Sequence, residues 1–299
     1  MIGRAEELDV VANSLAKSSA SAGVVMFGNL GVGKSRFAQE AAARCTDAVV
    51  RSAAGSSAAR GIPLGAFVSW LPADVLEPAQ AANRVVSELV DGVGARPCIV
   101  VVDDAHLLDD TSAFMLQQLV DRRLARLVLT VCTGATVPAA VSALWRDRSL
   151  HRLDLQPLGH ADCATLLASV LDGSVDPVTE RRLWRLTRGN VSFLRRIVEE
   201  ELTTGRLRRD DQTWTWLPGA VIPSSVCELI EHQMGDLTDA VAAVDHDESP
   251  CLSLLHRVAS DDVREHPQRQ RLRNRQQVDR VGDRVGQITH LMLDQLAHR

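Results

Sequence analysis

The sequence predicts an α/β fold in which a parallel, doubly wound sheet is followed by a helical segment with a small hairpin. Three observations support this prediction. Short apolar runs without polar alternation recur over residues 24–131 with helical patterns between them, as expected for strands buried on both faces of a parallel sheet. A glycine-rich loop separates the first run from a helical pattern. From Gly159 onward the pattern is helical, apart from one hairpin signal at 207–216.

Length and composition set the limits of the interpretation. The 299 residues correspond to roughly two domains of ~150 residues. A hydrophobic content of 45% with 24% charged residues is typical of globular chains and excludes a wholly disordered one. The net charge of −5 gives no general attraction to nucleic acid or anionic lipid. Six scattered cysteines without a CxxC pair are best explained as small apolar side chains.

The sequence also argues against a membrane location. The longest apolar runs are far shorter than the ~18 residues of a membrane-spanning helix. The N-terminal segment carries acidic residues where a signal peptide needs a basic and then an apolar stretch. We therefore expect a cytoplasmic protein with no membrane partner.

Residues 28–35 match G-x-x-x-x-G-K-[ST], the pattern of a phosphate-binding P-loop. Glycines let backbone N–H groups surround phosphate oxygens, Lys34 can reach the β- and γ-phosphates and assist their transfer, and Ser35 can offer its hydroxyl to Mg²⁺. A β-prone run at 24–27 precedes the loop and an alanine-rich helical pattern at 35–44 follows it, a context that disfavours a chance glycine turn. The candidate nucleotide-binding residues are Gly28, Asn29, Leu30, Gly31, Val32, Gly33, Lys34, Ser35 and Arg36.

A second signal lies at 98–104, where five apolar residues end in Asp103 and Asp104. Acids at the carboxyl end of a buried parallel strand form the Walker B pattern. Asp103 would hold Mg²⁺, usually through water, and Asp104 is the candidate that orients or deprotonates the attacking water. The alternative is a strand that leads into a helix cap, and we interpret Asp109 and Asp110 as acids of a helix start.

The remaining elements follow from their periodicity. We expect strands at 48–51, 127–131 and 150–155, and helices at 81–90, 115–120 and 139–145. Three apolar helical stripes follow residue 159, with Gly189 and Gly205 as C-caps. Trp214 and Trp216 alternate in the expected hairpin, which is more typical of packing than of base stacking.

The C-terminal part changes character near Asp245. A capping box at Ser225–Glu228 predicts one more helix before this point. Residues 245–299 contain an arginine-rich run at 269–275, but nine arginines there match nine acids, so we expect a solvated or disordered tail rather than a nucleic-acid site. The expected domains are therefore 1–158 for nucleotide binding, 159–244 for a helical lid with the hairpin, and 245–299 for the tail.

Together these motifs resemble the STAND-type, or AAA-type, P-loop ATPase module of large LuxR-family ATP-binding transcriptional regulators, over about residues 2–244. Besides the two Walker motifs, the likeness rests on Ile2–Leu8, similar to the family's G-R-x-x-E-L box, and on Leu186–Leu194, similar to its L-T-x-G-N-P-x-F-L segment. The resemblance implies a P-loop NTPase fold with ATP and Mg²⁺ as cofactors. It also implies that the opening box lies near the adenine, that nucleotide holds a switch between closed and open forms, and that hydrolysis is slow.

Three departures from the family pattern matter. Cys132 stands where the family commonly has an arginine that senses the γ-phosphate, and Val191 replaces the proline of the lid segment. The family-like pattern stops near Val244, so we expect a truncated or frameshifted version that lacks the sensor and helix-turn-helix domains and does not bind DNA directly. Loss of the arginine should weaken hydrolysis more than binding.

The first hypothesis is accordingly an ATP-binding switch module with slow or absent hydrolysis, whose partners are ATP or ADP and other proteins or a second copy. Two alternatives stay open. One is a stand-alone P-loop ATPase, and the other is a degenerate remnant that acts only through protein contacts.

Overall fold

The computed structural model describes residues 1–16, 18–71, 78–146 and 149–217. The chain divides into two compact units. The first, Gly3–Gln156, is called the sheet unit below, and the second, Met1–Ile2 with the chain from Pro157 onward, is called the helical unit. The expected capping box at Ser225–Glu228 and the expected tail at 245–299 lie outside the described residues.

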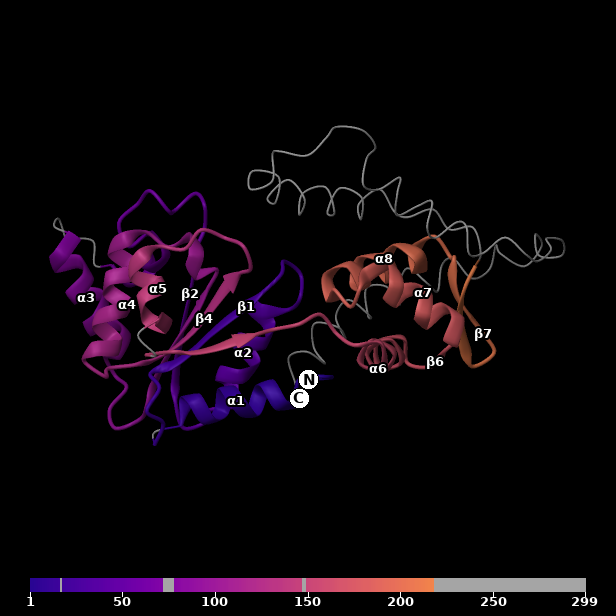
Figure 1. Cartoon of the computed structure of the whole chain (residues 1–299), viewed down its shortest axis with the longest axis horizontal. Helices are drawn as coiled ribbons and strands as arrows, with labels where there is room; N and C mark the ends of the chain where they lie inside the picture. Colours follow the sequence, from indigo (N-terminus) through magenta and orange to yellow (C-terminus); the bar gives the residue numbers. More distant parts are fainter. Residues whose placement is uncertain (17, 72–77, 147–148, 218–299) are drawn as a thin grey trace. The chain divides into compact units, whose positions relative to one another are not determined.

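The sheet unit is built around a five-stranded parallel sheet (Figure 1). In spatial order its strands are β2 (Val49–Ala54), β3 (Cys98–Asp103), β4 (Arg126–Cys132), β1 (Gly23–Gly28) and β5 (His151–Asp154). Each neighbouring pair is parallel, which confirms the predicted α/β fold class. The order places β4 between β1, which leads into the glycine-rich loop, and β3, which ends at the acidic pair.

Helices cover both faces of this sheet. They are α1 (Ala5–Leu15), α2 (Lys34–Ala43), α3 (Pro78–Val90), α4 (Asp110–Asp121) and α5 (Ala139–Arg146), with short 3-10 turns η1 (Gly65–Trp70) and η2 (Ala105–Leu107). Helices α3, α4 and α5 lie on one face, and α1 and α2 on the other (Figure 1). This arrangement explains why β1, β3 and β4 are apolar at successive positions rather than at alternate ones.

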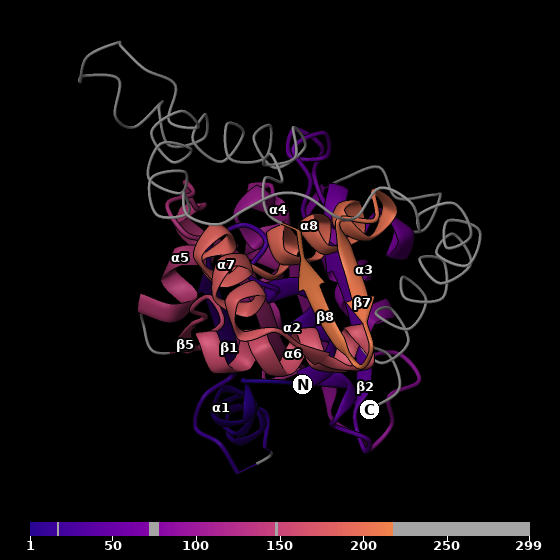
Figure 2. The same ribbon diagram turned by 90° about the vertical axis from the view of Figure 1, so that its right-hand side faces the viewer.

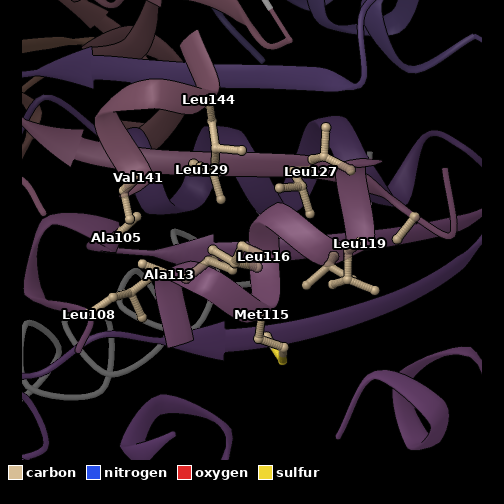
Figure 3. Packing of buried hydrophobic residues seen from close by; sticks show 14 of the residues in the cluster. Ala105, Leu108, Ala113, Met115, Leu116, Leu119, Leu127, Leu129, Val141 and Leu144 are labelled. Carbon is tan, nitrogen blue, oxygen red and sulfur yellow. The ribbon is translucent and has the colours of Figure 1, made fainter. Parts of the chain in front are cut away.

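Buried apolar side chains of β4, α4 and α5 form the core on the α4 and α5 face of the sheet (Figure 3). From β4 it receives Leu127 and Leu129, both 0% exposed. The apolar stripe predicted at 115–120 supplies the facing side of α4. Leu127 and Leu129 are two positions apart in the strand, so both side chains point to this face of the sheet and pack against these helices.

Within its described residues, the helical unit combines three helices with a small sheet (Figure 2). Its elements are α6 (His160–Leu171), α7 (Pro177–Thr187), α8 (Val191–Thr203) and a sheet of order β6 (Ser174–Val175), β8 (Thr213–Trp216), β7 (Leu207–Asp210). The antiparallel pair β7–β8 confirms the predicted hairpin, whereas β6, parallel to β8, was not predicted.

Both hairpin tryptophans pack inside the helical unit, as their interpretation predicted. Trp214 Nε1 donates to Leu171 O at 2.9 Å, and Trp216 Nε1 donates to Glu201 Oε2 at 2.7 Å. Glu201 is 1% exposed and also accepts two bonds from the Arg206 guanidinium, at 2.9 and 3.0 Å. The buried carboxylate is thus satisfied by an indole and a guanidinium.

The segment at 186–194 forms the turn between α7 and α8 and caps the start of α8. Gly189 follows α7 with φ +77°, and a Cβ there would lie 2.0 Å from Leu158 O. The chain at this point is therefore limited to glycine, and its carbonyl accepts from Leu158 N at 3.0 Å. Asn190 caps α8 by accepting from the N–H groups of Ser192 and Phe193 at 3.1 and 3.3 Å.

Replacing Leu129 by alanine should lower the free energy of unfolding by about 2–5 kcal/mol, because it leaves a cavity at the centre of the sheet. Urea denaturation followed by circular dichroism measures the loss. Val68→Ala is the control, since that side chain is 65% exposed and should cost no more than about 0.5 kcal/mol. Equal losses in the two variants would contradict the described core.

Candidate functional site

The glycine-rich loop joins β1 to α2, and each motif glycine has a steric reason. Gly31 and Gly33 have φ of +77° and +96°, in the left-handed region that favours glycine. Gly28 has no room for a side chain, because a Cβ would lie 2.8 Å from Val32 Cγ1 and 3.0 Å from Leu155 O. The motif residues therefore fix the shape of the loop.

Lys34 begins α2 and is 6% exposed. Its Nζ donates to the carbonyl oxygens of Gly28 and Asn29 at 2.8 and 3.0 Å. An ammonium has three N–H donors, so these two bonds leave capacity for an anionic ligand. Gly33 at the N-cap offers no side-chain cap to α2, and the N–H groups of an uncapped first turn favour an anion.

The other loop candidates differ in exposure. Asn29, Leu30 and Ser35 are exposed, Arg36 is half-buried and Val32 is buried. The Ser35 hydroxyl is therefore accessible from solvent, while Val32 supports the loop by packing under it.

The two acids lie at the same edge of the sheet as the loop, because β1, β3 and β4 are parallel and adjacent. Asp103 ends β3 and Asp104 follows with φ +48°. Burial raises the pKa of the Asp104 carboxyl above its ordinary value, and the neighbouring Asp103 raises it further, while His106 and Lys34 act in the opposite direction.

Thr130 of β4 contacts both acids and was not among the site residues predicted from the sequence. The side chain is 0% exposed. Its Oγ1 donates to Asp103 Oδ1 at 2.5 Å and accepts from the backbone N–H of Asp104 at 2.8 Å. The available signal was a single polar residue within the apolar run of 127–131.

His106, two residues after Asp104, also belongs to the site. Its Nδ1 accepts from the backbone N–H of Cys132 at 3.4 Å and lies 4.0 Å from Asp104 Oδ1. Burial lowers the pKa of the imidazole below its ordinary value. An accepting Nδ1 places the ring proton of the neutral form on Nε2.

The end of β4 connects the loop to the acids. Cys132, half-buried, pairs in register with Gly28. The next N–H, of Thr133, donates to Gly28 O at 3.2 Å, and the same carbonyl accepts from Lys34 Nζ. The position expected to carry an arginine in the resembled family thus lies directly beside the glycine-rich loop.

Asp109 and Asp110 belong to a helix start, as predicted. Asp109 is the N-cap of α4, where its Oδ1 accepts from Ser112 N at 2.9 Å. The same oxygen accepts from Leu64 N at 3.1 Å and so ties the segment after β2 to α4. Asp110 is exposed in the first turn.

The opening box lies at the start of α1 in the sheet unit. Arg4 is 6% exposed and donates to Glu7 Oε1 at 2.9 Å and to the carbonyl of Gln156, which follows β5. Arg4 therefore ties the start of α1 to the chain after β5. Among the described helices, none is long and apolar enough to cross a membrane.

No family model matches the sequence, and a search among curated proteins gives no match. Solved structures are similar to it. The ORC1 protein of Aeropyrum pernix, solved in complex with DNA, has a TM-score of 0.50 and 16% identity over 99% of this chain and 84% of that chain.

Two further structures have lower scores. The S. cerevisiae Hsp104–ADP complex has a TM-score of 0.48 and 12% identity over 99% of this chain and 39% of that chain. A RuvB mutant of Thermotoga maritima has a TM-score of 0.46 and 14% identity over 69% of this chain and 65% of that chain. At such identities a likeness concerns the fold alone, and the ORC1 comparison supports the α/β fold described above.

Replacing Asp109 by alanine should lower the free energy of unfolding by about 1–2 kcal/mol, because α4 loses its cap. Thermal or urea denaturation measures the change. Asp110→Ala is the matched control and should cost less, since its exposed carboxylate interacts with α4 mainly through the helix dipole. A larger loss for Asp110 than for Asp109 would contradict the assignment of the cap.

Proposed function

We propose that this chain is an ATP-binding switch module that hydrolyses ATP slowly, similar to the nucleotide-binding part of a LuxR-type transcriptional regulator. The observation that carries the proposal is the convergence of the glycine-rich loop, the buried Lys34 ammonium and the acidic end of β3 at one edge of a parallel sheet. The fold likeness supports the P-loop part of this proposal. The regulatory part rests on the sequence motifs.

The residues present are suited to a magnesium nucleotide. Loop residues 28–36 would surround the phosphates with N–H groups, and Lys34 would contact the β- and γ-phosphates. Ser35 and Asp103 offer hydroxyl and carboxylate oxygens, the ligand types that Mg²⁺ prefers, with Asp103 acting through water. When bound, the ion would neutralise charge on the phosphates.

The uncharged side chain of Cys132, beside the glycine-rich loop, supports slow hydrolysis. The Asp104 carboxylate is the candidate that orients or deprotonates the attacking water. The position beside Gly28 that could hold a positive side chain is Cys132, and a thiol offers no such charge to the transferring phosphoryl. Binding contacts made by the loop would persist without that charge, so turnover should suffer more than affinity.

We further propose that residues 1–158 bind the nucleotide and that residues 159–244 act as a lid. Other proteins, or a second copy of this chain, would bind differently to the nucleotide-bound and nucleotide-free forms in the cytoplasm. Direct DNA binding is not part of this proposal. Because the ORC1 structure contains DNA, a mobility-shift assay with duplex DNA is the appropriate check. A DNA shift that persists after removal of 245–299 would contradict the expectation that this chain does not bind DNA directly.

The first experiment compares melting temperatures with and without Mg-ATP. A ligand at ~100 times its Kd should stabilise the protein by about 2.7 kcal/mol, a shift of several degrees for a chain of this size. Lys34→Ala should abolish the shift because the buried ammonium is lost.

Arg44→Ala is the matched control for this experiment. Arg44 lies at the other end of α2 with an exposed side chain, and its removal should leave the shift intact. A wild-type protein that melts cooperatively but shows no shift would favour the degenerate remnant instead.

Replacing Cys132 by arginine should raise kcat for ATP hydrolysis by about tenfold or more and leave the Kd for ADP nearly unchanged, because a positive charge is added where the phosphoryl is transferred. Phosphate release measures kcat, and Cys132→Ser is the neutral control. Asp104→Asn should suppress turnover in either background. Rapid wild-type turnover with no gain from arginine would favour a stand-alone ATPase.

A further inference from the structure

Thr130 is a fully buried hydroxyl within an apolar strand. It lies between Leu129 and Val131 in the middle of the sheet and is 0% exposed. A hydroxyl in such surroundings is unfavourable unless it is hydrogen-bonded, whereas an apolar β-branched residue would suit a central strand. The presence of threonine therefore has to be explained by what its hydroxyl contacts.

Both contacts go to the acidic pair. The hydroxyl donates its single hydrogen to Asp103 Oδ1 at 2.5 Å and accepts from Asp104 N at 2.8 Å. One side chain thus restricts the rotation of the Asp103 carboxylate and holds the backbone of the next residue. The strand that supplies it, β4, is the neighbour of β3 in the sheet.

The backbone of Asp104 is held from a second side as well. Its φ of +48° is uncommon for a residue with a side chain. Gly55 N donates to Asp103 O at 2.8 Å, and a Cβ on Gly55 would lie 2.4 Å from Asp104 O. The close approach of Gly55 and the hydroxyl of Thr130 together fix the backbone from which the side chains of Asp103 and Asp104 extend.

From this geometry we propose that Thr130 is a positioning residue for the cation of the nucleotide site, which holds the Asp103 carboxylate in the orientation that Mg²⁺ requires. The inference rests on the proposed function, because it assumes that the glycine-rich loop binds a nucleotide. It goes beyond that function by separating two contributions: the loop binds phosphate without a metal, and Thr130 acts only on the Mg²⁺-dependent part of binding. Groups that orient metal ligands contribute to affinity in this selective way.

The test measures ADP binding by the full chain in two steps. Calorimetric titration in excess EDTA gives the metal-free affinity for ADP, and titration of MgCl₂ into the saturated complex gives the affinity for Mg²⁺. Thr130→Val should lower the Mg²⁺ affinity by about 10–100-fold and leave the metal-free ADP affinity unchanged. Thr130→Ser, which keeps the hydroxyl, should restore most of the Mg²⁺ affinity.

Two further variants sharpen the result. Ser142→Ala removes a buried hydroxyl of the same unit that bonds to Ala139 O within α5, and it should change neither affinity. In an Asp103→Ala background, Thr130→Val should cause no additional loss of Mg²⁺ affinity, because no side-chain oxygen is left there for the Thr130 hydroxyl to orient. If Thr130→Val does not fold, Thr130→Cys serves in its place, since a thiol is a weaker donor of similar size.

The outcomes separate the two proposals. No ADP binding by the wild type, with or without Mg²⁺, overturns the proposed function and this inference with it. ADP binding with equal Mg²⁺ affinity in the wild type and Thr130→Val overturns the inference alone. Equal losses in the metal-free and Mg²⁺-dependent steps also overturn it, because Thr130 would then only support the fold.

Discussion

The position of β4 between β1 and β3 is the constraint on which the candidate site depends. Parallel hydrogen bonding on both of its edges brings the loop after β1 and the acids after β3 to one edge of the sheet. The last residues of β4 then make the lateral connections. Thr130 reaches the acids, the N–H of Cys132 reaches His106, and Thr133 reaches the carbonyl of Gly28. Each connection uses backbone or a buried hydroxyl rather than a mobile surface side chain.

Charges of both signs lie at this edge of the sheet, and they affect which anions it can bind. A buried ammonium at Lys34 lies close enough to Asp104 to counteract the rise in its pKa, while adjacent Asp103 adds to that rise. Two neighbouring carboxylates repel further negative charge. A divalent cation that compensates part of this charge should therefore strengthen the binding of a polyphosphate at this edge.

The sequence predicted the features that are local and could not predict those that require strand order. The glycine-rich loop, the buried strands and the helix start at Asp109 are encoded within short windows of residues. The roles of Thr130 and His106 in the site were not predicted, because their partners lie 27 and 26 residues away in the sequence. Nothing in the local pattern identifies which strands are neighbours. The two-residue β6 was missed for the same reason, since its only signal is its pairing with β8.

The short outer strand β5 affects how copies of this chain can meet. An open sheet ends in a strand whose outer N–H and C=O groups can pair with a strand of another molecule. Three of the four β5 residues, His151, Arg152 and Asp154, are exposed and polar, and the latter two form an ion pair at 2.8 Å. The Arg152 guanidinium also lies 4.2 Å above the ring of Phe27. Charged groups held along so short a strand make pairing of β5 with a strand of another copy unfavourable, so contacts between copies at this edge would be made by side chains rather than by a continued sheet.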